Sequence, residues 1–193
     1  MTNGDLIGIH KSTVSRIVHW VASAIAAKRR DFVTFPVNAE LNNVKQDFYE
    51  IAGFPGVIGC IDCTHIRIIR PSAEIYRNRK GYFSINVQAV CDTNLRISSL
   101  VARWPGSTHD TRIFYNSVLS MRLENRELNG HLLGDNGYPN LPYLLTPILN
   151  PGNRGEQRYN ISHKTTRNTI ERLFGVLKRR FPALHYGIRF SLR

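Results

Sequence analysis

Hydrophobic positions change their spacing along this chain, and each spacing predicts a different kind of element. In residues 1–30, apolar side chains recur at helical spacing between Val14 and Ile25. Further on, apolar and β-branched runs are separated by short turns. This pattern predicts three antiparallel strands, at 57–69, 82–91 and 95–104.

The second half of the chain returns to longer periods. Helical spacing predicts a helix over 109–124, and a short buried strand follows at 131–135. Residues 136–162 are rich in Pro, Gly and Asn and predict loops. Ser162 is expected to cap a last long helix that reaches Phe181 and is stopped by Pro182. The order β-β-β-α-β-α predicts an α/β fold, a ribonuclease H-like mixed sheet with flanking helices.

We expect two parts, a helical segment over 1–50 and a catalytic domain over 51–193. Residues 8–16 resemble the turn and recognition helix of a helix-turn-helix, which is partial because the preceding helix would lie before Met1. Ser12 or Thr13 would cap this helix, and Lys11, Ser12 and Arg16 would contact DNA. The alternative is a plain amphipathic helix docked on the main domain.

Charge narrows the class of partner. The chain has 26 Lys and Arg against 14 Asp and Glu, a formal net charge of +12. Such an excess favours a polyanionic partner, although ordinary solubility is the alternative interpretation. No apolar run approaches the ~18 residues of a membrane span, and no segment has the pattern of a signal peptide. We therefore expect no membrane association.

Three cysteines, Cys60, Cys63 and Cys91, are an odd number and suggest reduced thiols inside a cell. The Cys60-x-x-Cys63 pair has the spacing of half a zinc site. A closed structural zinc site needs four ligands, and the chain has no second pair. We interpret both residues as strand or core positions.

Acidic residues are scarce, and four of them occupy distinctive settings. Asp62 lies in the first predicted strand, Asp110 begins the first helix, Asp135 ends the short strand and Glu171 lies in the last helix. In a ribonuclease H-like layout, Asp62 and Asp135 become neighbours, Glu171 is lowered onto the pair, and Asp110 lies near the same edge. Clustered carboxylates are the ligands that two divalent metals need for phosphoryl transfer.

The last helix can be checked by its geometry. At about 100° per residue, Arg167, Glu171 and Lys178 share one stripe that borders the apolar face. Such a stripe suits a carboxylate at the edge of a site with two cations near a phosphate backbone. The alternative is a surface ion pair between Arg167 and Glu171, four residues apart.

Four ordered motifs together resemble the DDE domain of PIF/Harbinger transposases over roughly residues 5–190. The motifs are Gly-Cys-Ile-Asp-Cys-Thr-His-Ile at 59–66, Pro-Gly-Ser-Thr-His-Asp at 105–110, Gly-Asp-Asn-Gly-Tyr-Pro at 134–139, and Tyr-Asn-Ile-Ser-His-Lys-Thr-Thr-Arg at 159–167 followed by Ile-Glu-Arg-Leu-Phe-Gly at 170–175 and Leu-Lys at 177–178. Arg167, Glu171 and Lys178 also match the Arg-x3-Glu-x6-Lys signature of related bacterial insertion-sequence transposases. Cys63 stands where the family usually has Gly, and Asn136 where Ser is common. The chain also stops at Arg193, before the terminal helices of the family.

The resemblance implies a Mg²⁺- or Mn²⁺-dependent DNA nuclease or transposase in the nucleus, also possible in the cytoplasm. It implies double-stranded DNA as substrate, a Myb/SANT-like accessory protein and a possible homo-oligomer. The catalytic metal ligands carried over are Asp62, Asp110, Asp135 and Glu171, with Asp135 favoured over Asp110 as second member of the triad. The DNA-binding cations are Arg167, Lys178, Arg179 and Arg180.

A protein derived from a transposase and no longer cutting DNA is the main alternative. It would bind DNA, or a Myb-like partner protein, without catalysis. All four acids are present in the chain, which favours the nuclease.

Overall fold

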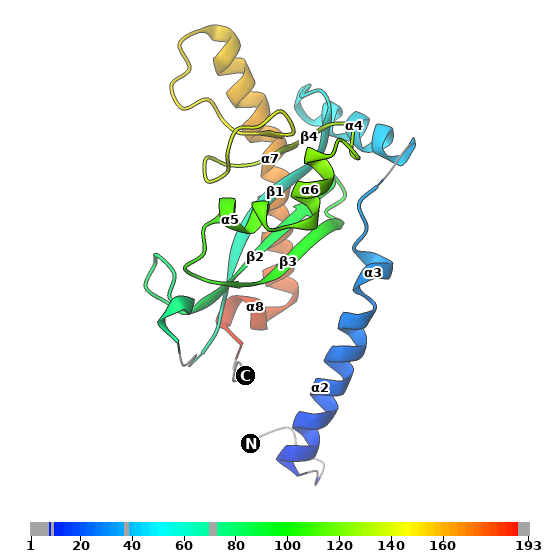
Figure 1. Ribbon diagram of the computed structural model, residues 1–193, viewed down its shortest axis with the longest axis vertical. Helices are drawn as coiled ribbons and strands as arrows, with labels where there is room; N and C mark the ends of the chain where they lie inside the picture. Colours follow the sequence, from blue (N-terminus) through cyan, green and yellow to red (C-terminus); the bar gives the residue numbers. More distant parts are fainter. Residues whose placement is uncertain (1–7, 9, 37–38, 70–72, 189–193) are drawn as a thin grey trace. The chain divides into compact units, whose positions relative to one another are not determined.

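The computed structural model describes residues 8, 10–36, 39–69 and 73–188. The chain forms two compact units, Met1–Thr34 and Phe35–Arg193 (Figure 1). The described residues of the first unit form the helices α2 (Lys11–Ala27) and α3 (Arg29–Phe32). In the described part of the chain, no helix combines the length and the apolar character that a membrane span needs.

The start of α2 differs from the prediction. His10 is the N-cap, and its Nδ1 accepts the backbone N–H of Ser12 at 3.3 Å. Ser12 and Thr13 lie inside the first turn, so neither caps the helix. His10 takes this place because its backbone is extended and its ring reaches an N–H two residues on. Recognition of DNA by Lys11, Ser12 and Arg16 stays a prediction, and residues 1–7 lie outside the described ones.

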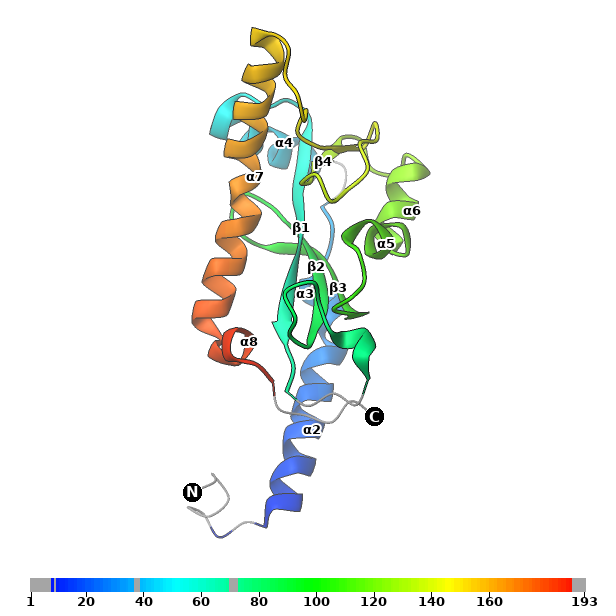
Figure 2. The same cartoon turned by 90° about the vertical axis from the view of Figure 1, so that its left-hand side faces the viewer.

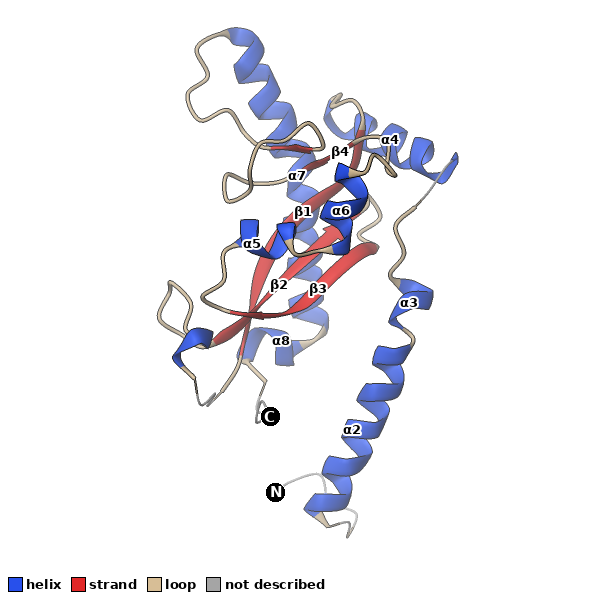
Figure 3. Ribbon diagram, viewed as in Figure 1, coloured by secondary structure: helices blue, strands red, loops and turns tan. Residues whose placement is uncertain are grey.

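The second unit is an α/β structure of five strands with helices around them (Figure 3). Its elements in chain order are α4 (Ala39–Ala52), β1 (Val57–Arg67), the 3₁₀ helix η1 (Glu74–Tyr76), β2 (Ser84–Cys91), β3 (Ile97–Pro105), α5 (Asp110–Tyr115), α6 (Val118–Glu124), β4 (His131–Leu133), β5 (Leu144–Leu145), α7 (Arg154–Arg180) and α8 (Pro182–Tyr186).

The sheet is mixed, as predicted, and its strand order is β3-β2-β1-β4-β5. Strands β1, β2 and β3 pair antiparallel, whereas β4 pairs parallel with β1 and with β5. This topology places the end of β4 beside the middle of β1, where Cys60 pairs with Leu133. A mixed five-stranded sheet with flanking helices is compatible with a ribonuclease H-like fold.

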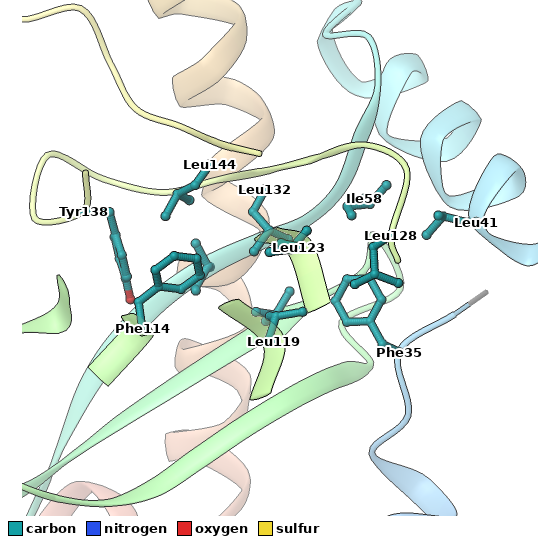
Figure 4. Close-up of a cluster of buried hydrophobic side chains, with 12 residues drawn as sticks. Phe35, Leu41, Ile58, Phe114, Leu119, Leu123, Leu128, Leu132, Tyr138 and Leu144 are labelled. Atoms are coloured by element: carbon teal, nitrogen blue, oxygen red, sulfur yellow. The ribbon is translucent and has the colours of Figure 1, made fainter. Parts of the chain in front are cut away.

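Helices cover both faces of the sheet, α7 on one and α5 with α6 on the other (Figure 2). Each face has its own hydrophobic core, since alternate residues of a strand point to opposite sides. Under α7 and α4 lie Phe48, Phe54, Val57, Cys60, Ala89, Cys91, Leu133, Ile170, Leu173 and Phe174. The core on the other face gathers side chains of α5, α6, β1 and β4, with further residues from α4, β2, β5 and the connecting segments (Figure 4). Its members are Phe35, Leu41, Ile58, Ile61, Val90, Phe114, Leu119, Leu123, Leu128, Leu132, Tyr138 and Leu144.

Several elements differ from the prediction. The helix expected over 109–124 is two helices, because Ser117 leaves the helical conformation and caps α6 through a hydrogen bond from the N–H of Ser120 at 3.1 Å. The last helix begins at Arg154, not at Ser162, and Asn153 caps it by accepting the N–H of Glu156 at 2.9 Å. The segment predicted as loop also contains β5.

The second unit begins earlier than the expected boundary at residue 51. It starts at Phe35 and includes α4. The reason is that Leu41 and Phe48 of α4 are buried in the two cores of the sheet domain.

Candidate active site

Strand β1 distributes its side chains between the two faces of the sheet, and this alternation builds the site. Asp62 and Thr64 meet side chains of α7, Arg167 and Lys178 respectively. The intervening Cys63 points to the other face, where its Sγ lies 3.2 Å from the hydroxyl of Tyr138. The strand period of two therefore presents one carboxylate and one hydroxyl in a row beneath α7.

Asp62 is a largely buried carboxylate. Its Oδ1 accepts the backbone N–H of Cys63 at 2.7 Å, and its Oδ2 accepts from Nη1 of Arg167 at 3.0 Å. Burial, together with the negative charge of Asp135, raises the pKa of Asp62 to about 6, against the opposing effect of Arg167. The negative charge of Asp62 is only partly balanced by its neighbours, so an additional cation would stabilise the ionised carboxylate.

Asp135 and Asp110 flank one glycine. Oδ1 of Asp135 accepts the N–H of Gly137 at 2.9 Å. A Cβ atom built on Gly137 would lie 3.0 Å from that Oδ1 and 3.4 Å from Oδ2 of Asp110. A side chain at position 137 would therefore crowd both carboxylates. Glycine in the Gly-Asp-Asn-Gly-Tyr-Pro motif lets the two acids approach the same point.

Asp110 is the first residue of α5 and lies at the face of the sheet opposite α7. Its Oδ1 accepts from Nδ2 of Asn86 at 2.9 Å, and Asn86 also donates to the carbonyl of Thr108. Thr111 ties α5 to the Asp135 loop by donating to the carbonyl of Gly137 at 2.6 Å. These bonds fix the position of Asp110 near Asp135.

Glu171 is linked to Asp62 only through Arg167. Nη2 of Arg167 pairs with its carboxylate while Nη1 of the same guanidinium pairs with Asp62. The Glu171 side chain is 53% exposed, against 17% for Asp62. The ion pair between residues 167 and 171 thus exists, and it is part of a three-residue chain that continues into the sheet.

The other predicted cations divide into two groups. Lys178 donates through Nζ to the hydroxyl of Thr64 at 2.6 Å and lies near Lys80, and its burial lowers its pKa. Arg179 and Arg180 are exposed at the end of α7. Lys11, Ser12 and Arg16 belong to the first unit.

The expectation that the two cysteines of the Cys-x-x-Cys pair are strand residues agrees with the structure. Cys60 donates through its thiol to the carbonyl of Thr166 on α7, whereas Cys63 lies on the opposite face with Tyr138. All three cysteines are free thiols. Burial raises the pKa of Cys91 to about 12 and keeps this thiol protonated.

Strand β2 carries a row of polar residues that was not predicted from the sequence. Ser84, Asn86 and Gln88 are all buried. Asn86 holds Asp110, and Gln88 accepts from the hydroxyl of Tyr138 at 3.4 Å. The sequence pattern did not reveal this row, because alternating polar and apolar residues are typical of a strand whose polar side faces solvent. Here the polar residues are buried and the intervening Ile85 and Val87 are only half-buried.

The carboxylates suit a hard divalent cation. Among the described residues, no group of three or more His, Cys, Asp or Glu side chains is placed to hold a metal ion. However, Mg²⁺ is usually bound by one or two carboxylates, with water and substrate phosphate completing its coordination. Asp62, whose pKa is raised by burial and by the negative charge of Asp135, forms with Asp135 a pair of carboxylates that meets that requirement.

A mixed sheet that brings several carboxylates together is typical of metal-dependent enzymes that act on phosphodiester bonds. Comparison with known proteins identifies the family. Residues 61–193 match the family described as DDE superfamily endonuclease, and the chain belongs to this family.

Its relatives include "Putative nuclease HARBI1" of Homo sapiens, 38% identical over 185 residues that cover 94% of this chain and 53% of that protein. The Mus musculus protein of the same name is 39% identical over 185 residues, with the same coverage of 94% and 53%. "Protein ALP1-like" of Arabidopsis thaliana is 29% identical over 201 residues, covering 94% of this chain and 49% of that protein. The chain therefore spans about half the length of the curated relatives it matches. No solved structure matches it. The predicted resemblance to Harbinger-type DDE proteins is confirmed.

Proposed function

We propose that this chain carries a metal-dependent DNA endonuclease site of the Harbinger transposase type. It hydrolyses phosphodiester bonds and, in transposition, joins a freed 3′-OH to target DNA. The observation that carries this proposal is the largely buried carboxylate of Asp62, whose pKa is raised to about 6 by burial and by the negative charge of Asp135, within a chain of net charge +12. Membership of the endonuclease family supports the same reaction class.

The roles follow from the placement of the side chains. Asp62 and Asp135 would hold Mg²⁺ or Mn²⁺, with Asp110 and Glu171 bordering the site. When bound, the metal supplies an activated water and stabilises charge on the leaving oxygen. Asn86 orients Asp110, and the Gly137 N–H orients Asp135. Arg167 and Lys178 bind phosphate groups on the α7 face.

The biological setting extends the proposal. We include double-stranded DNA, a nuclear location, a Myb/SANT-like accessory protein and homo-oligomerisation. Their support is the resemblance to Harbinger-type proteins and, for DNA, the basic charge.

A cleavage assay tests the proposed function. Purified protein is incubated with supercoiled plasmid in Mg²⁺ or Mn²⁺ and, separately, in EDTA. We expect nicked circles only with metal, and the new ends should carry a 3′-OH that a DNA polymerase extends. DNA binding without any nicking would instead support the non-cutting alternative.

Lys178 should contribute to DNA affinity. Thr64 lies two strand residues beyond Asp62, about 6.6 Å along β1, so Lys178 lies where a phosphate next to the one at Asp62 would pass. In Lys178→Met, we expect the slope of log affinity against log salt to become shallower by about 0.9, the loss of one phosphate contact. Fluorescence anisotropy of a labelled duplex at several salt concentrations measures this slope. Lys45→Met on α4 is the control, and equal slopes for both variants would contradict the assignment.

A further inference from the structure

The guanidinium of Arg167 lies between the carboxylates of Asp62 and Glu171 and pairs with both. Nη1 contacts Oδ2 of Asp62 at 3.0 Å, and Nη2 contacts the carboxylate of Glu171. The Arg167 side chain is only 16% exposed. Given the proposed function, we infer that Arg167 is a positioning residue that competes with the metal for Asp62, so that metal binding releases this guanidinium to hold a DNA phosphate.

The two carboxylate oxygens of Asp62 accept hydrogen bonds from different kinds of donor, one in the backbone and one in a side chain. Oδ1 is held by the N–H of Cys63 within the same strand, and this backbone group cannot move away without breaking β1. Oδ2 is held by a side chain. A divalent cation approaching Oδ2 would meet the positive guanidinium at close range, and like charges repel strongly in a partly buried setting. Arg167 must therefore leave Oδ2 when the metal binds.

Glu171 offers the Arg167 guanidinium a partner outside the buried site. Glu171 lies four residues further along α7, one turn of helix, and its carboxylate is half exposed. Retaining this contact would turn the guanidinium from the buried Asp62 toward solvent. Lys178 lies on the same stripe of α7 and contacts Thr64. The released Arg167 thus joins a row of cations that faces the incoming phosphate backbone.

This arrangement links metal binding and DNA binding. One guanidinium cannot remain on Asp62 and also bind phosphate at the mouth of the site, so each ligand favours the state that the other requires. Such coupling is reciprocal and typically amounts to about 5- to 150-fold in affinity. Two simpler roles predict otherwise. A purely structural ion pair would change stability without affecting metal affinity, and a simple phosphate contact would weaken DNA binding equally with and without metal.

The test compares three variants with the wild type. Arg167→Gln removes the charge and keeps an amide that can hydrogen-bond, Arg167→Lys keeps the charge, and Arg172→Gln removes an exposed charge from the same helix. Isothermal titration calorimetry without DNA gives the Mn²⁺ affinity of each protein. Anisotropy of a labelled duplex, in EDTA and in Ca²⁺, gives the gain in DNA affinity on metal binding. Thermal melts in EDTA identify any variant that does not fold.

We expect Arg167→Gln to bind Mn²⁺ at least ~5-fold more tightly than wild type and to lose most of the Ca²⁺-dependent gain in DNA affinity. Arg167→Lys and Arg172→Gln should bind Mn²⁺ like the wild type. The inference is overturned if Arg167→Gln binds Mn²⁺ no more tightly than Arg172→Gln, or if neither they nor the wild type bind it. Should Arg167→Gln fail to fold, Mn²⁺ binding to Arg167→Lys that is as weak as or weaker than wild type supports the inference, and tighter binding overturns it.

Failure of the proposed function has a different signature. If Arg167→Gln binds Mn²⁺ more tightly than the wild type, and metal raises the DNA affinity of the wild type, yet the wild type does not nick DNA, the coupling stands and the nuclease proposal fails. A wild type that nicks DNA, with unchanged Mn²⁺ affinity in Arg167→Gln, would retain the nuclease and lose the coupling.

Discussion

Asparagine in place of Asp135 should reduce metal-dependent DNA cleavage by roughly 10³-fold, because loss of a ligand charge removes several kcal/mol of metal and transition-state stabilisation. The fold should persist. Oδ1 of Asp135 accepts the N–H of Gly137, and an asparagine Oδ1 can accept the same bond. The substitution therefore removes the charge and leaves the local turn intact.

The matched control is Asp92→Asn. Asp92 also accepts a backbone N–H, that of Arg96 at 2.8 Å, and lies in the turn between β2 and β3. Initial rates of plasmid nicking in Mn²⁺ compare the two variants, and urea denaturation compares their stabilities. Cleavage by Asp135→Asn within about tenfold of the Asp92→Asn rate, at equal folding, would contradict a ligand role for Asp135.

Alanine in place of Phe114 should destabilise the second unit by about 3–5 kcal/mol, the usual loss for a buried phenylalanine. Phe114 is 0% exposed, and its ring packs edge-on against Tyr138 at 6.1 Å between centroids. It anchors α5, the helix that begins with Asp110. The loss should therefore loosen one border of the site as well as the core.

Tyr115→Ala supplies the comparison for Phe114→Ala. Tyr115 is the next residue of α5 and is 53% exposed, so its removal should cost less than about 1 kcal/mol. Urea titration at 25 °C, followed by circular dichroism, measures both free energies of unfolding. If the two alanine variants were equally stable, Phe114 would not anchor α5 in the way the packing indicates.

Local patterns in the sequence predicted the central sheet. The apolar run of β1, the turns after it and the helical spacing of α7 are properties of neighbouring residues, so they are readable one segment at a time. Helical spacing places Arg167, Glu171 and Lys178 on one stripe, and the contacts of α7 agree with it. Arg167 pairs with Asp62 of β1 and with Glu171, and Lys178 contacts Thr64 of β1.

Two errors at helix ends have local causes that the sequence contained. Asn153 and Glu156 cap the helix together, since Oδ1 of Asn153 accepts the N–H of Glu156 and Nδ2 of Asn153 donates to the Glu156 carboxylate at 2.9 Å. The same carboxylate accepts the N–H of Gly152 at 2.6 Å. This signal starts α7 well before Ser162, whose hydroxyl instead donates to the carbonyl of Ala52. Ser117 likewise has the type of side chain that begins a new helix.

Long-range contacts could not be predicted in the same way. Asp62 and Arg167 lie 105 residues apart in the chain, and their ion pair follows from how α7 packs across the sheet. The strand β5 has only two residues, too few to show a period, and forms because β4 offers it a partner. The position of Asp110 depends on Asn86, a buried residue of another strand.

Plasmid nicking by the wild type and by Asp62→Asn, purified identically and assayed side by side in Mn²⁺ and in EDTA, tests whether Asp62 belongs to a catalytic metal site. We expect the wild type to nick DNA only with metal, and Asp62→Asn to bind the same DNA without cutting it. Equal nicking by both proteins, or none by a folded, DNA-bound wild type, would contradict a catalytic site at Asp62.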